Sequence, residues 1–316
     1  MVIKSGAAFE RLGGIRHLAV DKTGTLTRNQ PEVTGVIPAD GFDRTQVLSF
    51  AAAVEQQSTH PLAAAIVAAE PEAPTALDIS EEAGHGIGGT VKGRRVLVGS
   101  PRWIDAGPLK ADVERMESEG QTCVLVTVDD ALAGAIGVRD ELRPEVPDAV
   151  QSLHANDVEV SMLTGDNTRT ARALAEIAGI DDVRAELRPE DKASIVAELS
   201  SKTPTAMIGD GINDAPALAG ATVGIAMGAT GSDAAIESAD VAFTGHDLRL
   251  IPKALQHARR GSRIINQNIV LSLAIIIVLM PLAISGVLGL AAVVLVHEVA
   301  EVIVILNGLR AAQAKR

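Results

Sequence analysis

An uncharged run near the C-terminal end restricts the fold of this 316-residue chain more than any other feature. No charged residue occurs between Ile269 and Val296, and the apolar character continues to Leu309. A single helix over these residues would be about 60 Å long, about twice the thickness of a bilayer core. The run therefore predicts two membrane-spanning helices, at about 266–285 and 289–309, joined by a turn at 285–289 near the helix breakers Pro281, Gly286 and Gly289.

Basic residues flank this apolar hairpin on both sides: Arg259, Arg260 and Arg263 before it, and Arg310, Lys315 and Arg316 after it. Positive charge collects on the cytoplasmic side of a membrane, so both ends of the hairpin are expected there. The sequence thus predicts an integral protein of the cell membrane, in contact with lipid, whose preceding segments are cytoplasmic. The alternative is a buried hairpin in a soluble protein, although soluble helices seldom carry so long an uncharged run.

Three ionisable residues, His297, Glu298 and Glu301, interrupt the second predicted helix. Ionisable groups at membrane depth are costly and therefore usually functional. Glu298 and Glu301 are three apart and share a helix face, with His297 adjacent. A histidine beside carboxylates suits a divalent transition cation. The alternative is that these residues lie near a helix end or pair with polar groups of other helices.

Composition excludes some classes of function. The net charge is −12, and the chain has one Trp, four Phe and no Tyr. Nucleic-acid binding needs clustered basic residues and aromatic platforms, so no nucleic-acid partner is expected. Cys123 is the single cysteine, which excludes an internal disulfide.

Before residue 256 the sequence alternates short apolar runs with helical stretches such as 168–178 and 192–199. The runs "IRHLAVD", "EVSMLTGD", "TAMIGDG" and "VGIAMG" each end in Gly or Asp. This pattern predicts an α/β fold with a doubly wound parallel sheet, in which chemistry collects at the carboxyl ends of the strands. Four acids follow these ends: Asp21, Asp166, Asp210 and Asp214.

Each acid in this group has a plausible task. A carboxylate such as Asp21, at the end of a strand, can accept a phosphoryl group and form an aspartyl phosphate. Mg²⁺ prefers oxygen ligands, and Asp21, Asp210, Asp214 and the Thr23 carbonyl offer them. The "GDGINDAPAL" stretch crowds Asp210 and Asp214 into one loop, where like charges repel unless a cation neutralises them.

Transfer of a phosphoryl group also needs donors for its developing charge. Lys192, in "PEDKASI" at a helix start, supplies a cation, and the loop of Thr164 and Gly165 supplies a hydroxyl and amides.

Residues 28–130 read as an insert with its own strands, between segments 1–27 and 131–255 of the parallel-sheet domain; residues 256–316 form the membrane part. Within the insert, His60 and Pro61 stand at a helix start. Gly84 and Gly86, in "GHGIGG", leave room for a ligand to approach the backbone. Together these motifs predict a nucleotide pocket in which His60 stacks on a base.

These segments together resemble the P-type ATPases, and more narrowly their heavy-metal-transporting subgroup. "DKTGTLT", "TGDN" and "GDGINDAPAL" match the three phosphorylation-domain motifs in the right order, and "HPLA" and "GHGIGG" indicate the subgroup. The resemblance implies a haloacid-dehalogenase-like sheet, an inserted α+β nucleotide-binding domain and a C-terminal transmembrane hairpin. It also implies ATP-driven cation transport through an aspartyl phosphate on Asp21, with Mg²⁺ at Asp210 and Asp214. Around the phosphoryl group it places Thr23, Thr164, Gly165, Asp166, Lys192 and Asn213.

For the nucleotide, the resemblance implies an adenine pocket made of Glu55, His60, Gly84 and Gly86, with Ser100 where an Asn is usual. In the membrane, "HEVAE" resembles the His-Glu-Gly-x-Thr signature of cobalt/zinc-type pumps. His297 and Glu298 match this signature, so a divalent transition metal of the Co/Zn type is the expected cargo. The chain departs from the signature at two positions, where Val299 replaces the Gly and Glu301 the Thr.

Soluble relatives of this sheet, the haloacid-dehalogenase-like phosphatases, carry a second acid two residues after the nucleophile, which activates water. Here that position is Thr23, so the acyl phosphate is expected to persist. The alternatives are such a phosphatase and a nucleotide-binding regulatory remnant.

A complete pump also has an actuator domain and about six earlier helices with a Cys-Pro motif, which the resemblance does not cover. A truncated product, a misassigned start and one half of a split pump, partnered by a separate N-terminal half, all fit; we expect no transport by this chain alone.

Overall fold

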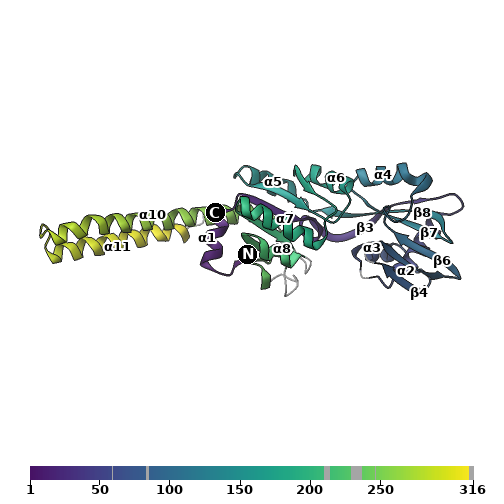
Figure 1. The fold of residues 1–316 in the computed structure, drawn as a ribbon, viewed down its shortest axis with the longest axis horizontal. Helices are drawn as coiled ribbons and strands as arrows, with labels where there is room; N and C mark the ends of the chain where they lie inside the picture. The colour runs from purple at the N-terminus through teal and green to yellow at the C-terminus, as the bar shows by residue number, and fades with distance from the viewer. Residues whose placement is uncertain (59, 83–84, 210–213, 229–236, 246, 313–316) are drawn as a thin grey trace.

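A computed structural model describes residues 1–58, 60–82, 85–209, 214–228, 237–245 and 247–312 of the chain. Figure 1 shows three parts along its length. A long helical hairpin forms one end, a sheet flanked by helices lies in the middle, and a second sheet forms the other end.

The middle part is built on a seven-stranded sheet. In spatial order its strands are β1 (Val2–Ile3), β13 (Val241–Phe243), β12 (Val223–Met227), β11 (Thr205–Gly209), β2 (His17–Asp21), β9 (Glu159–Leu163) and β10 (Asp182–Arg184). All neighbours are parallel except β1, which pairs antiparallel with β13. Strands β2, β11 and β12 are buried at every position, as expected for a parallel sheet covered on both faces.

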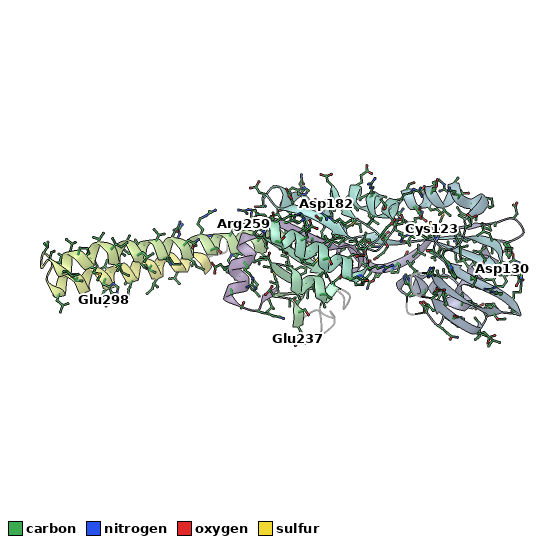
Figure 2. The ribbon with its side chains drawn as sticks, in the orientation of Figure 1. Cys123, Asp130, Asp182, Glu237, Arg259 and Glu298 are labelled. Carbon is green, nitrogen blue, oxygen red and sulfur yellow. The ribbon has the colours of Figure 1, made fainter. Side chains whose placement is uncertain are left out.

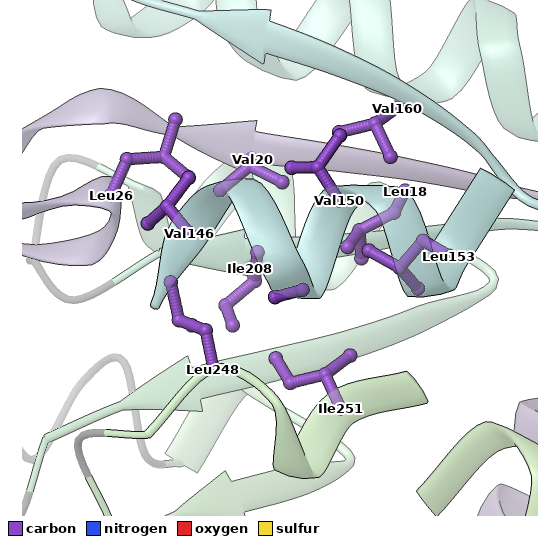
Figure 3. A pocket seen from close by; sticks show the side chains of 11 residues that line it. Leu18, Val20, Leu26, Val146, Val150, Leu153, Val160, Ile208, Leu248 and Ile251 are labelled. Atoms are coloured by element: carbon purple, nitrogen blue, oxygen red, sulfur yellow. The ribbon is translucent and has the colours of Figure 1, made fainter. Parts of the chain in front are cut away.

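Helices cover both faces of this sheet. Helices α1 (Gly6–Gly14), α5 (Val146–His154), α6 (Thr168–Ala178) and the start of α10 (Leu250–Ile284) pack on one face, and α7 (Pro189–Lys202) and α8 (Ala215–Gly220) on the other. Because side chains alternate along a strand, Leu18 and Val20 face the first layer and Ala19 the second. Figure 3 shows Leu18 and Val20 around a small apolar cavity with Val150 and Ile251. The predicted doubly wound α/β fold is therefore confirmed.

The second sheet has six antiparallel strands in the spatial order β3 (Thr27–Pro38), β8 (Ala131–Leu142), β7 (Thr122–Val128), β6 (Arg94–Gly99), β5 (Gly86–Val91) and β4 (Leu77–Glu82). Helices α2 (Arg44–Glu55) and α3 (Pro61–Ala69) pack on one face of it. The short helix η2 (Gly107–Leu109) and α4 (Lys110–Ser118) pack on the other. After the roles predicted from the sequence, we call this part, residues 27–142, the nucleotide unit, and the parallel sheet with its helices the phosphorylation unit.

Strand β8 begins at the boundary predicted at residue 130 and pairs with strands of the insert. Residues 131–142 pair with β7 and β3 and so belong to the nucleotide unit rather than to the phosphorylation unit. The physical reason is the turn at Asp129 and Asp130, whose φ angles of 51° and 63° match a two-residue hairpin turn and fold β8 back onto β7. The unit boundaries themselves remain a prediction.

The hairpin consists of α10 and α11 (Leu290–Ala312). Both are long and apolar enough to cross a membrane. Helix α10 spans 35 residues, about 50 Å, and its first turns are buried against the phosphorylation unit while its second half is exposed. Pro281 lies in the last turn of α10 instead of ending it, and the chain reverses at Gly286, where φ is +74°. The expected turn at 285–289 is confirmed, and α11 brings the chain back toward the base of the hairpin (Figure 1).

Candidate active site and membrane site

Strand register brings the predicted phosphorylation residues to one edge of the parallel sheet. Asp21 ends β2 and lies opposite Leu163 of β9, while Val20 lies opposite Ile208 of β11. Thr164 and Gly209 therefore follow at the same edge on the two neighbouring strands. A Cβ at Gly209 would lie 2.6 Å from Oδ2 of Asp214, so only glycine allows that carboxylate to approach.

Lys192 joins two of the predicted acids. It lies in the first turns of α7, and its Nζ donates to Oδ1 of Asp21 and, at 3.0 Å, to Oδ1 of Asp214. All three side chains are nearly buried, with exposed fractions of 12% for Lys192, 6% for Asp21 and 4% for Asp214. Burial alone would lower the pKa of Lys192, but the two carboxylates outweigh it and raise that pKa. The lysine is therefore a fixed cation between two anions.

A second ion pair lies beside the first. Nζ of Lys22, directly after Asp21, is 2.5 Å from Oδ2 of Asp166. The backbone amide of Asp166 donates to the hydroxyl of Thr164 at 3.1 Å, which fixes the loop after β9. A Cβ at Gly165 would lie 3.2 Å from the carbonyl oxygen of Leu187, so a larger residue would need that carbonyl to shift slightly. Thr164, Gly165 and Asp166 thus lie at the strand edge beside Asp21.

The turn η1 (Lys22–Leu26) after Asp21 is held from two directions. Arg143 donates to the carbonyl oxygens of Gly24, at 3.1 Å, and Thr25, at 3.0 Å. The hydroxyl of Thr27 accepts from the amide of Gly24 at 3.2 Å, and Gly24 adopts a φ of 71°. The hydroxyl of Thr25 is buried without a hydrogen-bond partner among the residues described. Arg143 and Lys22 escaped prediction because their partners are distant in sequence.

Several predicted positions cannot be compared with the structure. Asp210, Asn213 and Gly84 lie outside the described residues. Within the described part of the chain, no three His, Cys, Asp or Glu side chains cluster closely enough to form a complete metal site. Asp21 and Asp214 nevertheless supply buried carboxylate oxygens at one edge, and the donor set is all oxygen, which suits Mg²⁺ rather than a softer metal.

In the nucleotide unit, Glu55 ends α2 and His60 caps the N-terminus of α3, as predicted for a His-Pro helix start. Nδ1 of His60 accepts from the amide of Leu62 at 3.3 Å, and the hydroxyl of Ser58 accepts from the amide of His60 at 3.1 Å. Glu55 is 7% exposed. Burial and the nearby Glu81 raise its pKa to about 7, although a hydrogen bond with Ser58 opposes the shift.

Gly86 begins β5, in the predicted pocket. A Cβ there would lie 2.1 Å from the carbonyl oxygen of Val98, so the close pairing of β5 with β6 already requires glycine. Ser100 follows β6 next to this position: its amide donates to the carbonyl of His85, and its hydroxyl is buried without a partner among the described residues. The ring of Trp103 packs edge-on against that of His85.

In the hairpin, a cavity between α10 and α11 collects two of the three predicted membrane residues. Nε2 of His297 lies 3.3 Å from Oε1 of Glu301, one helical turn away, and both line the cavity. Ser272 of α10 lines it from the opposite side, which the sequence did not reveal. Glu298, labelled on the hairpin in Figure 2, is exposed and is not among the residues that line the cavity.

Side-chain amides connect the two helices nearer the cytoplasmic end. Nδ2 of Asn268 donates to the carbonyl oxygen of Val304 at 3.2 Å, and Nδ2 of Asn307 donates to Oδ1 of Asn268 at 2.8 Å. Interhelical hydrogen bonds of this kind stabilise helix pairs in lipid. They hold the two helices in the register in which Ser272 and His297 line the same cavity.

Comparison with known proteins agrees with this geometry. A family model described as haloacid dehalogenase-like hydrolase matches residues 15–222. The "Probable cation-transporting ATPase G" of Mycobacterium tuberculosis is 57% identical over 315 residues, which cover 100% of this chain and 41% of that protein. The "Zinc/cadmium/lead-transporting P-type ATPase" of Escherichia coli is 43% identical over 313 residues, a match that covers 98% of this chain and 42% of that protein. The chain thus spans about two fifths of the relatives' length.

Solved structures show the same relationship. The crystal structure of a zinc-transporting PIB-type ATPase in the E2.Pi state matches with a TM-score of 0.75 and 42% identity, over 99% of this chain and 52% of that one. The catalytic domain of the CPx-ATPase CopB-B matches with a TM-score of 0.65 and 28% identity, over 80% of this chain and 94% of that one. The chain therefore belongs to the haloacid dehalogenase-like hydrolases and, within them, is a homologue of the C-terminal portion of heavy-metal P-type ATPases.

Proposed function

We propose that this chain is the catalytic C-terminal portion of an ATP-driven pump for a divalent transition-metal cation, and that Asp21 carries the phosphoryl group during the cycle. The observation that carries the proposal is the buried arrangement of Asp21, Lys192 and Asp214 at the carboxyl edge of the parallel sheet. The P-type relatives generally use ATP and Mg²⁺, and the all-oxygen donor set at this edge suits that pair.

In the proposed reaction a carboxylate oxygen of Asp21 attacks the terminal phosphorus of ATP. The new P–O bond forms as the bond to the bridging oxygen breaks, and ADP leaves with that electron pair. Lys192 offers its positive charge to the phosphoryl oxygens, and the hydroxyl of Thr164 and the amide of Gly165 donate hydrogen bonds to them. Asp21, Asp214, Asp210 and the Thr23 carbonyl would hold Mg²⁺, which supplies charge neutralisation when bound.

The aspartyl phosphate is expected to persist. The second residue after Asp21 is Thr23, which has no carboxylate to activate water. Lys22 already neutralises Asp166, so this acid is held in an ion pair. A long-lived intermediate suits a pump, because a conformational change must precede hydrolysis.

For the nucleotide we propose a pocket in which the base contacts His60 and Glu55, with Gly84 and Gly86 close to the ligand. The buried unpartnered hydroxyl of Ser100 supports this position, because a ligand there would satisfy it. Asn213 would contact the phosphates.

For the cargo we propose that His297 and Glu301, with Ser272 on the facing helix, contribute ligands to a site for a Co/Zn-type cation. A nitrogen and an oxygen donor within 3.3 Å suit such a metal, and further ligands would come from helices of the remaining part of the pump. Glu298 does not line this cavity and is proposed to contact lipid or another helix. The hairpin would lie in the cell membrane with both catalytic units in the cytoplasm.

The test is acid-quenched labelling of the detergent-solubilised chain with γ-labelled ATP and Mg²⁺. We expect a hydroxylamine-labile label that Asp21→Asn abolishes and that a chase with unlabelled ATP removes slowly. Rapid turnover with release of phosphate would instead indicate a phosphatase. Absence of label with retained ATP binding would indicate a nucleotide-binding remnant.

A further inference from the structure

A cluster of polar contacts joins the nucleotide unit to the start of α6 in the phosphorylation unit. Helices α4 and α6 lie side by side across this junction (Figure 1). Glu117 of α4 is the centre of the cluster: its side chain is only 10% exposed although it is charged. A buried carboxylate is retained only where it is paired and hydrogen-bonded, so its partners indicate its purpose.

Both partners of Glu117 belong to the phosphorylation unit. Oε1 accepts from Nδ2 of Asn167 at 3.1 Å, and Oε2 lies 3.0 Å from Nη1 of Arg169. The same arginine reaches Oε1 of Glu114 at 3.3 Å, and the hydroxyl of Thr170 donates to the carbonyl oxygen of Gln121 at 2.8 Å. The start of α6 thus receives contacts from Glu114 and Glu117 of α4 and from Gln121, which follows that helix.

A second bridge reaches the same turn from the nucleotide side. Nη2 of Arg102, two residues after Ser100, lies 3.4 Å from Oε1 of Glu186. Glu186 in turn accepts from the hydroxyl of Thr168 at 3.2 Å and donates its amide to the carbonyl oxygen of Asp166 at 2.8 Å. Its φ of 62° is rare for a residue other than glycine, so local contacts must hold it in place.

These contacts end next to the reacting groups. Asn167 directly follows Asp166, which pairs with Lys22 beside Asp21. Asn167 also caps α6, since its Oδ1 accepts from the amide of Thr170 at 2.9 Å. One side chain therefore caps α6 through its oxygen and holds the nucleotide unit through its nitrogen.

We propose that Glu117, with Asn167 and Arg169, forms a latch that fixes the nucleotide unit in the orientation needed to deliver ATP to Asp21. This inference rests on the proposed function and adds positioning residues to it. The chain passes between the two units through β3 and β8, and a two-strand connection alone would leave their orientation adjustable. The latch supplies the missing constraint and must open whenever the units separate.

The experiment compares two phosphoryl donors on the full chain in detergent. Acetyl phosphate can phosphorylate Asp21 directly, leaving acetate, and does not use the nucleotide unit, whereas ATP needs both units. For Glu117→Ala we expect the labelling rate at subsaturating ATP to fall about tenfold, the usual effect of losing a hydrogen-bonded charge. Labelling by acetyl phosphate should stay within about twofold. With ATP, the labelling rate of Glu117→Gln should lie between those of the parent and Glu117→Ala, because its amide oxygen can still accept from Asn167.

The matched control is Arg115→Gln on the same helix, because Arg115 pairs with Asp112 and Glu119 on its own segment. We expect no change with either donor. An equal loss with both donors for Glu117→Ala, or no loss with either, would overturn the latch. Failure of the parent chain to be labelled by either donor would instead count against phosphorylation of Asp21.

A distance measurement tests the latch without catalysis. Spin labels on cysteines introduced at the exposed positions Lys92 and Glu176 report on the two units. Cys123 will not compete for the label, because it is buried and burial raises its pKa to about 12. We expect a narrow distance distribution in the parent and a broad one after Glu117→Ala. The same narrow distribution in both would refute the latch.

Discussion

The replacement of Glu55 by glutamine tests the electrostatics of the nucleotide pocket. Burial is the main cause that raises the pKa of Glu55, and the charge of Glu81 adds to it. Glutamine has nearly the same shape, can still bond with Ser58 and cannot ionise. The variant should therefore lose the pH-dependent penalty of the carboxylate with little change in packing.

The size of the effect follows from the pKa, which rises from 4.5 to about 7 on folding. Below pH 4.5 the carboxyl group of Glu55 is protonated in both the folded and the unfolded state, so it does not change the stability of the fold with pH. Between 4.5 and 7 the unfolded chain loses the proton first, so the stability of the folded state falls as the pH rises. At about 1.36 kcal/mol per pH unit, the penalty reaches about 3 kcal/mol above pH 7.

The assay is urea denaturation at several pH values, followed by the fluorescence of Trp103. This is the only tryptophan and lies in the nucleotide unit, so it reports unfolding of that unit. Glu55→Gln should match the parent near pH 4.5 and exceed its stability by up to about 3 kcal/mol at pH 8. Glu81→Gln should recover only a small part of this gain. A difference between Glu55→Gln and the parent that is constant with pH would refute the reasoning.

Three further predictions concern other parts of the chain. Lys192→Met should slow labelling of Asp21 by ATP at least about a hundredfold, because it removes the cation from the phosphoryl site; the acid-quench assay measures this rate. Gly86→Ala should destabilise the nucleotide unit by more than about 1 kcal/mol in urea, since the added methyl group overlaps the neighbouring strand. Ser272→Ala should weaken Zn²⁺ or Co²⁺ binding in equilibrium dialysis about tenfold, whereas Glu298→Gln, outside the cavity, should leave it unchanged; the reverse order would contradict the assignment of the cavity.

Local sequence patterns were sufficient for most of the scaffold. Short apolar runs ending in Gly or Asp gave the parallel strands, because those residues mark buried strands and their carboxyl ends. The helix 168–178 was predicted to the residue, since Asn167 is a strong N-cap and Gly179 a strong C-cap. The length of the uncharged run likewise determined the hairpin and its turn.

Features that depend on contacts between distant segments were not predictable in this way. Lys22 and Asp166 are 144 residues apart, and Glu117 and Arg169 are 52 apart, so no local pattern reveals either pair. Residues 131–142 were predicted to belong to the phosphorylation domain, but they pair in the antiparallel sheet; a buried strand reads alike in either sheet. Glu298 and Glu301 share a broad helix face, but only the position of α10 shows which of them enters the cavity.

The most direct test of the account is to locate the phosphorylated residue. Reduction of the acid-quenched phosphoenzyme with borohydride converts an aspartyl phosphate to homoserine, and peptide mass spectrometry then identifies the position. We predict homoserine at position 21, formed only when ATP and Mg²⁺ are both present. Modification at any other residue, or an unmodified peptide around Asp21 despite bound label, would contradict the account.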